Sequence, residues 1–137
     1  MLVDGDGVKY EGRMHLGDAG HDLRYVGEPV ILAPGERMLM STGLFVEQGA
    51  LDGGVGMICP RSGLAHNHGI SVVNSPGIVD SLYRGEIKVN VINMGSEEVE
   101  FHEGDRIAQF VPVRLLADEW TGDGMERGEG GHGSSGR

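Results

Sequence analysis

The sequence Glu86-Ile87-Lys88-Val89-Asn90-Val91 alternates between polar and apolar residues without a break. Because successive side chains of a β-strand point to opposite faces of a sheet, this period of two predicts a half-buried strand. The segment 107–115 is apolar at nearly every position, which predicts a strand that is buried on both faces. This strand-like alternation outweighs helical periodicity along the chain, so the sequence favours an all-β fold.

Further short strands are expected on both sides of this stretch, separated by turn signals such as Pro34-Gly35 and Asp52-Gly53-Gly54. The expected strands cover Leu23 to Val26, Pro29 to Leu32, Met38 to Val46, Val55 to Cys59 and Val99 to Phe101. Short strands at this spacing indicate a β-sandwich or a barrel.

Two segments depart from the strand pattern. Residues 62–69 are interpreted as a helix of one or two turns, in which Ser62 caps the start and Gly69 ends the last turn. From Ala117 onward the apolar pattern is lost, and the chain becomes rich in glycine. We therefore expect one β-domain over residues 1–116 and a flexible C-terminal arm over residues 117–137.

Length and composition exclude several classes of protein. A chain of 137 residues is the size of one domain, and its net charge of −10 argues against general binding to nucleic acids or anionic membranes. A single cysteine, Cys59, excludes an intrachain disulfide framework and suits a reducing compartment. The sequence contains neither a run of about 20 apolar residues nor a visible targeting signal, so a cytoplasmic location is expected.

Pro60-Arg61-Ser62-Gly63 lies between an expected strand and the expected helix. It brings together a cation, a hydroxyl group and the free backbone amides of a helix start, which are the groups that bind an anion. The alternative is a capped helix that carries a surface arginine.

The stretch from Asn74 to Glu86 is rich in turn residues and is interpreted as a β-hairpin. Its exposed backbone groups, with the amide of Asn74, are suited to pairing with a planar base, while Tyr83 closes the side of the sugar. Asp80 is a candidate general base that holds a water molecule. An ordinary hairpin with a solvated aspartate is the alternative.

The end of the chain, residues 127–137, offers backbone amides, hydroxyl groups, one imidazole and two guanidinium groups. Such a segment can close over a phosphorylated ligand, although its glycine pattern is not that of a P-loop. A disordered tail is the alternative. Cys59, His66 and His68 are better explained as a buried thiol and two solvated rings than as a metal site or a nucleophile.

Five motifs in chain order resemble those of the homotrimeric all-β dUTPases. They are Asp18-Ala19-Gly20-His21-Asp22-Leu23, Pro60-Arg61-Ser62-Gly63-Leu64-Ala65, Gly77-Ile78-Val79-Asp80-Ser81-Leu82-Tyr83-Arg84-Gly85, Gly104-Asp105-Arg106-Ile107-Ala108-Gln109 and the segment 127–136. The resemblance spans residues 18–137 and implies a distorted jelly-roll β-sandwich of the β-clip type. His132 departs from the pattern, because many members of the family carry phenylalanine there.

The resemblance implies an enzyme that hydrolyses dUTP to dUMP and pyrophosphate by in-line attack of water on the α-phosphate. Asp80 would activate the water. Mg²⁺ chelated by the triphosphate would be contacted by Asp22 through the water shell of the ion. The residues that would hold the phosphates are Arg61, Ser62, Gly63 and Gln109. Such a reaction keeps uracil out of DNA and supplies dUMP for dTMP synthesis.

For recognition of the nucleoside, the resemblance implies that Asn74 and backbone groups of Ile78 and Val79 pair with uracil. Tyr83 would exclude a ribose 2′-hydroxyl, and Lys88 would be a further substrate contact. In the C-terminal arm, Arg127 would contact the γ-phosphate, His132 would stack on the base, and Ser134 and Ser135 would bind phosphate oxygens. The family is a homotrimer whose active sites are shared between subunits.

Two alternatives remain open on the sequence. A related dCTP deaminase would use a glutamate as acid and base at the cytosine ring, and it would release ammonia. A phage regulatory protein built on the same fold would form a stable complex with a host protein.

Overall fold

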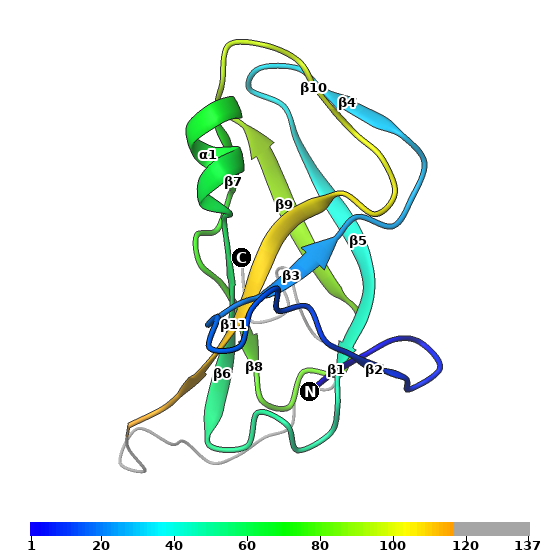
Figure 1. The fold of residues 1–137 in the computed structure, drawn as a ribbon, viewed down its shortest axis with the longest axis vertical. Coiled ribbons are helices and arrows are strands. Elements are labelled where there is room, and N and C mark those ends of the chain that lie inside the picture. Colours follow the sequence, from blue (N-terminus) through cyan, green and yellow to red (C-terminus); the bar gives the residue numbers. More distant parts are fainter. Residues whose placement is uncertain (117–137) are drawn as a thin grey trace, which may run out of the picture.

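The computed structural model describes residues 1–116, which form eleven strands and one short helix (Figure 1). The strands are β1 (Leu2–Val3), β2 (Lys9–Tyr10), β3 (His21–Arg24), β4 (Val30–Leu32), β5 (Arg37–Val46), β6 (Gly54–Cys59), β7 (Ile70–Val72), β8 (Gly77–Asp80), β9 (Ile87–Asn93), β10 (Val99–Phe101) and β11 (Arg106–Arg114). Helix α1 (Ser62–His68) joins β6 to β7. In residues 1–116 no helix has the length and apolar character that crossing a membrane requires.

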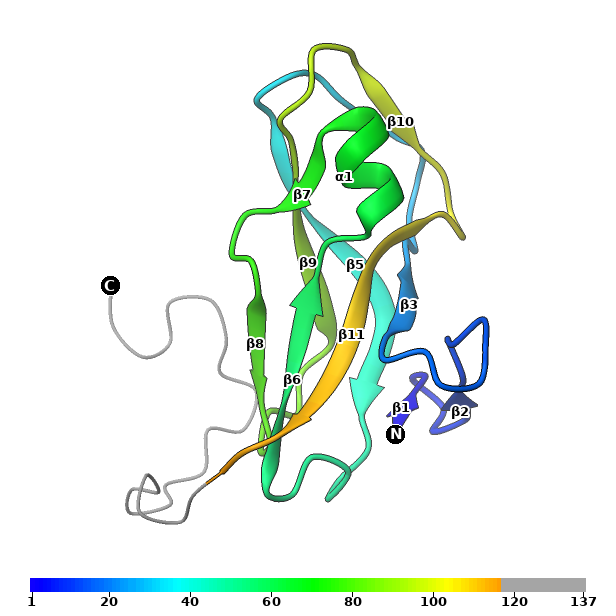
Figure 2. The ribbon, with the colours of Figure 1, turned by 60° about the vertical axis from the view of Figure 1, so that its left-hand side comes forward.

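The strands form three antiparallel sheets. A five-stranded sheet has the order β2-β1-β5-β9-β7, a four-stranded sheet has the order β3-β11-β6-β8, and β10 pairs with β4. Figure 2 shows β8, β6 and β11 side by side, with β9 and β5 in the layer behind them. The expected all-β sandwich with one short helix is therefore confirmed.

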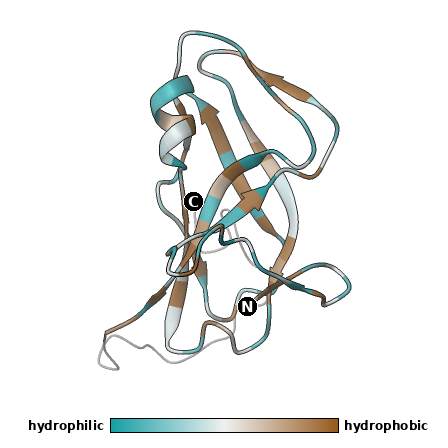
Figure 3. Ribbon diagram, viewed as in Figure 1, coloured by the Kyte–Doolittle hydropathy of each residue, from teal (hydrophilic) through white to brown (hydrophobic). Residues whose placement is uncertain are grey.

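The core lies between the two larger sheets and follows from the alternation in β9. The side chains of Ile87, Val89 and Val91 are at most 1% exposed, whereas the intervening Lys88 is exposed. They join one cluster with residues of the opposite sheet, such as Phe110 on β11. Each such aliphatic side chain contributes about 1.5–3 kcal/mol through burial. Figure 3 shows the contrast between the largely apolar strands and the mostly polar helix α1, which has no buried residue.

The predicted hairpin over residues 74–86 is wrong. Strand β8 pairs with β6, with Val79 opposite Gly56, whereas β9 pairs with β5 and β7. The chain therefore passes from one sheet to the other between Asp80 and Ile87. Turn residues predict a change of direction, but they do not specify which strand becomes the hydrogen-bonding partner.

The predicted N-cap of helix α1 is also wrong. Arg61 occupies the N-cap position with an extended backbone, and its carbonyl accepts the first helical hydrogen bond, from Ala65 N–H at 3.0 Å. Ser62 is thus the first helical residue, and no side chain caps the helix. Gly69 ends the helix as predicted, with φ 69° and ψ 20°, a left-handed conformation that glycine adopts without strain.

Candidate active site

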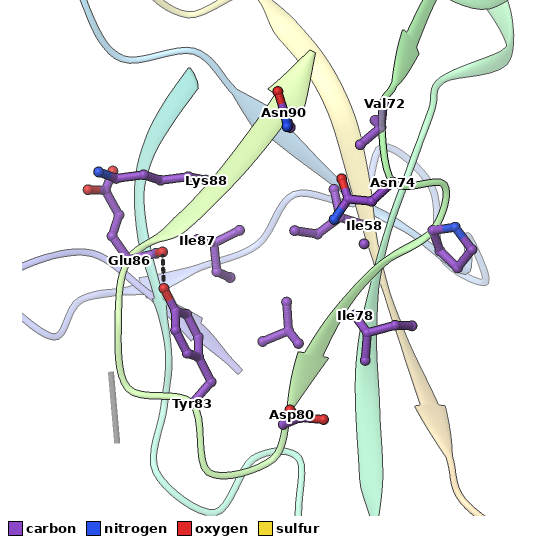
Figure 4. Close-up of a pocket in the computed structure, with 13 residues that line it drawn as sticks. Ile58, Val72, Asn74, Ile78, Asp80, Tyr83, Glu86, Ile87, Lys88 and Asn90 are labelled. Atoms are coloured by element: carbon purple, nitrogen blue, oxygen red, sulfur yellow. Dashed lines mark hydrogen bonds between the residues drawn. The ribbon is translucent and has the colours of Figure 1, made fainter. Parts of the chain in front are cut away.

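A pocket of about 340 Å³ lies where β8 and β9 diverge (Figure 4). Its walls come from β6, from the 74–83 segment and from the first residues of β9. The lining residues are Ile58, Val72, Asn74, Pro76, Gly77, Ile78, Val79, Asp80, Tyr83, Glu86, Ile87, Lys88 and Asn90. This size is at the lower end of the range for small-molecule sites. The structure therefore brings five of the predicted ligand contacts and the predicted general base to one cavity.

Asn74 lies at one side of this pocket, on the exposed segment between β7 and β8. A Cβ on Gly77 would stand 3.3 Å from the side-chain nitrogen of Asn74. The absence of a side chain at Gly77 therefore lets the Asn74 amide lie close to the backbone of β8. Val79 is buried, whereas Ile78 is 54% exposed. In Figure 4 the side chain of Ile78 points away from Tyr83, so the backbone of this residue is the part available to the pocket.

Tyr83 forms the opposite wall. Its hydroxyl donates a hydrogen bond of 2.9 Å to the backbone carbonyl of Glu86, and its backbone N–H donates to the carbonyl of Asp80 at 3.1 Å. A Cβ on Gly85 would stand 2.4 Å from the tyrosine oxygen, so the ring packs directly over this glycine. The position of the ring is thus fixed by the turn that leads into β9.

Asp80 and Lys88 lie on the two strands that bound the pocket. Asp80 is the last residue of β8 and is partly buried, opposite Val55 of β6. Lys88 is exposed near the start of β9. A carboxylate and an ammonium group therefore both border the cavity.

A second group of predicted residues gathers on the other large sheet. The register places Gln109 of β11 between Asp22 of β3 and Cys59 of β6. The Nε2 atom of Gln109 donates a hydrogen bond of 3.0 Å to the carbonyl of Pro60. A Cβ on Gly20 would stand 2.3 Å from the side-chain oxygen of Gln109, so glycine is required there for this close approach.

Asp22 connects two guanidinium groups within this second group. Arg61 Nε donates to Asp22 Oδ1 at 3.1 Å, and Arg106 Nη1 lies 3.7 Å from Asp22 Oδ2. The Asp22 side chain is only 13% exposed, so the two ion pairs are partly shielded from water. Ser62 and Gly63 are exposed beside Arg61, and the space around Gly63 is open for 4 Å. The two guanidinium groups and Asp22 thus form a partly buried cluster with a net positive charge, which is the kind of group that attracts an anion.

In residues 1–116 no three His, Cys, Asp or Glu side chains are close enough to hold a metal ion by themselves. Asp22 is the acidic group that lies among the cations. One carboxylate fits an ion such as Mg²⁺, which keeps several waters and takes other ligands from substrate phosphates. Asp22 therefore fits a metal ion that takes most of its other ligands from water and from phosphate oxygens.

The two groups do not share a pocket within the described residues of one chain, because neither Arg61 nor Arg106 lines the cavity beside Tyr83. Arg127, His132, Ser134 and Ser135 lie outside the described residues, so their predicted roles stay predictions. Cys59 is partly buried, and burial raises the pKa of its thiol, which disfavours a role as nucleophile.

Two residues that contact the predicted site residues have no role assigned to them in the sequence analysis, Arg106 and Glu86. Arg106 belongs to the fourth motif, and its position three residues before Gln109 was the signal that could have identified it. Glu86 contributes the carbonyl that receives the Tyr83 hydroxyl, and a backbone contact of this kind leaves no signal in the sequence.

Comparison with known proteins identifies the family. The dUTPase family model matches residues 11–136. A deoxyuridine 5′-triphosphate nucleotidohydrolase of Nocardia farcinica is 50% identical over 135 residues, covering 95% of this chain and 80% of the relative. The protein of the same name from Mycobacterium leprae is 50% identical over 141 residues, covering 95% and 89%.

Solved structures agree with this assignment. A dUTPase from Streptococcus mutans superimposes with a TM-score of 0.66 and 28% identity, covering 77% of this chain and 86% of that chain. A mutant dUTPase from phage phi11 of S. aureus, whose structure describes the coordination of a structural Mg(II) ion, has the same fold with a TM-score of 0.72 and 22% identity, covering 89% and 94%. On the family match and the identity to these relatives, the chain belongs to the dUTPase family.

Proposed function

We propose that this chain hydrolyses dUTP to dUMP and pyrophosphate, using the pocket between β8 and β9 for the nucleoside. Membership of the dUTPase family establishes the class of reaction. The observation that carries the assignment of the site is the single cavity of about 340 Å³ that Asn74, Asp80 and Tyr83 all line. Hydrolysis of dUTP keeps uracil out of DNA and supplies dUMP for dTMP synthesis, which is consistent with a cytoplasmic enzyme.

In this proposal uracil lies beside β8. The Asn74 amide and the backbone groups of Ile78 and Val79 pair with the donors and acceptors of the base. Cytosine presents the reversed pattern, which would leave buried groups unpaired, so it is rejected strongly. Val79 and Ile58 are buried and form a stiff apolar wall against the methyl group of thymine.

Tyr83 stands against the sugar, where its ring leaves no room for a ribose 2′-hydroxyl. Asp80 accepts a proton from the attacking water, which is aligned with the bond between the α-phosphate and the leaving pyrophosphate. Lys88 contributes positive charge at the border of the pocket. The position of Asp80 at the end of a paired strand supports this role, because the strand holds the carboxylate in a fixed place.

Arg61, Ser62, Gly63 and Gln109 hold the phosphates. Asp22 orients the Arg61 guanidinium through the hydrogen bond of 3.1 Å, and it would contact the water shell of Mg²⁺. When bound, Mg²⁺ supplies charge neutralisation for the pyrophosphate leaving group. Arg106 adds a second cation beside Asp22, so the phosphate site stays positive although the protein carries a net charge of −10.

We further propose that the active enzyme is a homotrimer. Within one chain the phosphate residues and the nucleoside pocket are separate, which supports a site completed by the nucleoside pocket of one subunit and the phosphate residues of another. The glycine-rich arm, residues 117–137, would reach this site from a third subunit. Arg127 would bind the γ-phosphate, His132 would stack on uracil, and Ser134 and Ser135 would bind phosphate oxygens.

The test is pyrophosphate release with Mg²⁺ from dUTP, dCTP, dTTP and UTP, for the wild-type chain and for Asp80→Asn. We expect release from dUTP alone, and a loss of about 100-fold or more in kcat for Asp80→Asn with nucleotide binding retained. Undiminished turnover by Asp80→Asn would contradict the role of Asp80, and a folded trimer inactive on all four nucleotides would contradict the function.

The same assay separates the alternatives. Ammonia release from dCTP would indicate the deaminase, which no observation favours. The likeness to the phage phi11 protein is at 22% identity and therefore supports the fold alone, so it does not favour a regulatory role.

A further inference from the structure

Strand β5 contains a bulge opposite the start of β9. The register changes between Ser41, which faces Lys88, and Leu44, which faces Ile87. Thr42 lies in this bulge and is 4% exposed. Its hydroxyl donates a hydrogen bond of 2.6 Å to the Ile87 carbonyl and accepts one of 3.2 Å from Leu44 N–H. A buried side chain therefore replaces the ladder bonds that the bulge interrupts.

Glu86 makes the second contact across the same bulge. The backbone N–H of Gly43 donates to Glu86 Oε2 at 2.9 Å, and Gly43 has φ 68°, a conformation that glycine adopts without strain. A hydrogen bond to an ionised, partly buried carboxylate is stronger than one between neutral groups. The Glu86 side chain thus fixes its own backbone to a rigid strand.

That backbone is the part of the molecule that holds Tyr83. The Glu86 carbonyl accepts the Tyr83 hydroxyl at 2.9 Å, and the ring packs on Gly85 (Figure 4). A displacement of Glu86 therefore moves the hydrogen-bond acceptor of the tyrosine and the surface beneath its ring together. The contacts of Thr42 and Gly43 on β5, in the five-stranded sheet, therefore help to fix the position of Tyr83 at one wall of the nucleoside pocket.

We propose that Glu86, assisted by Thr42, is a positioning residue that holds Tyr83 rigid enough to discriminate deoxyribose from ribose. The inference rests on the proposed function, in which Tyr83 faces the sugar. A steric wall rejects one extra hydroxyl only if it cannot move aside, and a loosened ring would admit UTP. Glu86 borders the pocket, and in this account it acts on the sugar through Tyr83 and not on the reacting atoms.

The test compares kcat/KM for dUTP and for UTP in variants that differ only at this contact. Glu86→Ala removes the acceptor of the Gly43 N–H, whereas Glu86→Gln keeps an acceptor oxygen in the same place. Gly85→Ala displaces the ring directly, because the new Cβ would lie 2.4 Å from the tyrosine oxygen. Glu28→Ala is the matched control, since this exposed glutamate lies away from the pocket lining.

We expect the UTP-to-dUTP ratio of kcat/KM to rise about tenfold or more in Glu86→Ala and Gly85→Ala, mainly through a lower KM for UTP. Glu86→Gln and Glu28→Ala should keep the wild-type ratio. A role in stability alone would lower both activities equally and leave the ratio unchanged in Glu86→Ala, and that result would overturn the inference. If Glu86→Ala does not fold, Glu86→Asp takes the place of that variant in the comparison, because its side chain is one methylene shorter and withdraws the carboxylate from Gly43 N–H.

The affinities of dUMP and UMP, measured by calorimetry on the same variants, separate this inference from the proposed function. A wild-type chain that binds dUMP in preference to UMP without hydrolysing dUTP would contradict the catalytic proposal only. The binding ratio would then decide the role of Glu86. An unchanged dUMP preference in both Glu86→Ala and Gly85→Ala would overturn the inference regardless of turnover.

Discussion

Replacing Asn93 with alanine removes three hydrogen bonds from a side chain that is completely buried. Its Nδ2 atom donates to the Leu32 carbonyl at 2.9 Å and to the Glu97 carbonyl at 2.8 Å, and its Oδ1 atom accepts from Gly95 N–H at 2.9 Å. These bonds join the end of β9 to β4 and to the turn that leads into β10. Asn93→Ala therefore leaves two carbonyls and one N–H without their partner.

The magnitude follows from these bonds. Three intramolecular hydrogen bonds contribute about 1 kcal/mol each, and unpaired buried groups add to the loss. We therefore expect the free energy of unfolding to fall by about 3–4 kcal/mol. For a domain of this size that corresponds to a fall in Tm of roughly 10–15 °C. The turn also contacts helix α1, since a Cβ on Gly95 would stand 2.3 Å from the His68 carbonyl. Activity should consequently fall in the protein that stays folded.

Thermal and urea unfolding, at one fixed protein concentration, measure this loss of stability. Asn67→Ala is the matched control, because Asn67 is exposed on helix α1. We expect that control to stay within about 0.5 kcal/mol of wild type. A loss below about 1 kcal/mol in Asn93→Ala would refute the argument that these three bonds hold the end of β9.

Three further predictions concern neighbouring parts of the fold. Gly56→Ala places a Cβ 2.2 Å from the Phe110 ring, so we expect a loss of about 1–3 kcal/mol in urea unfolding, and an unchanged midpoint would contradict this packing. Burial raises the pKa of the Cys59 thiol, so at pH 8 a smaller fraction of Cys59 is thiolate in the folded protein than in the unfolded chain. The reaction of Cys59 with a disulfide reagent should therefore be faster in the unfolded chain, and equal rates would contradict the raised pKa. Gln109→Leu loses the bond to the Pro60 carbonyl and should lower Tm by only a few degrees but kcat/KM for dUTP about tenfold. Unaltered kinetics would remove Gln109 from the proposed site.

Much of the fold follows from local patterns. Strand β10 has the expected bounds, and β5, β6 and β11 differ from expectation by about one residue, because their alternating or continuous apolar character reflects burial directly. Strand β3 begins and ends two residues earlier than expected. The sequence patterns do not predict strands β1, β2 and β7, since segments of two or three residues are too short to show a period. They are fixed instead by pairing, of β1 with β5, of β2 with β1 and of β7 with β9.

The site shows a similar division. Asn74, Asp80 and Tyr83 are candidates from the sequence because their residue types suit base pairing, proton transfer and a sugar wall, and all three line one cavity. The ion pairs of Asp22 join residues far apart in the sequence, and only the pairing of β3, β6 and β11 brings them together. Contacts that depend on register across a sheet cannot be read from a single sequence, so the motif that contains Arg106 does not predict its ion pair with Asp22.

The incorrect hairpin prediction concerns the part of the chain that lines the proposed nucleoside pocket. In a hairpin, β8 and β9 would face each other as neighbouring strands about 4.7–4.9 Å apart, and no ligand would fit between them. Because β8 instead pairs with β6 and β9 with β5, the two strands diverge, and a pocket of about 340 Å³ opens between them. Each of the two strands thus buries its apolar side chains as part of a different sheet. Tyr83 and Glu86 lie on the connection between those sheets. Hydrogen bonds tie them to both sheets, from Tyr83 N–H to the Asp80 carbonyl of β8 and from Gly43 N–H of β5 to Glu86, which gives this short turn the rigidity that the proposed selection of a sugar requires.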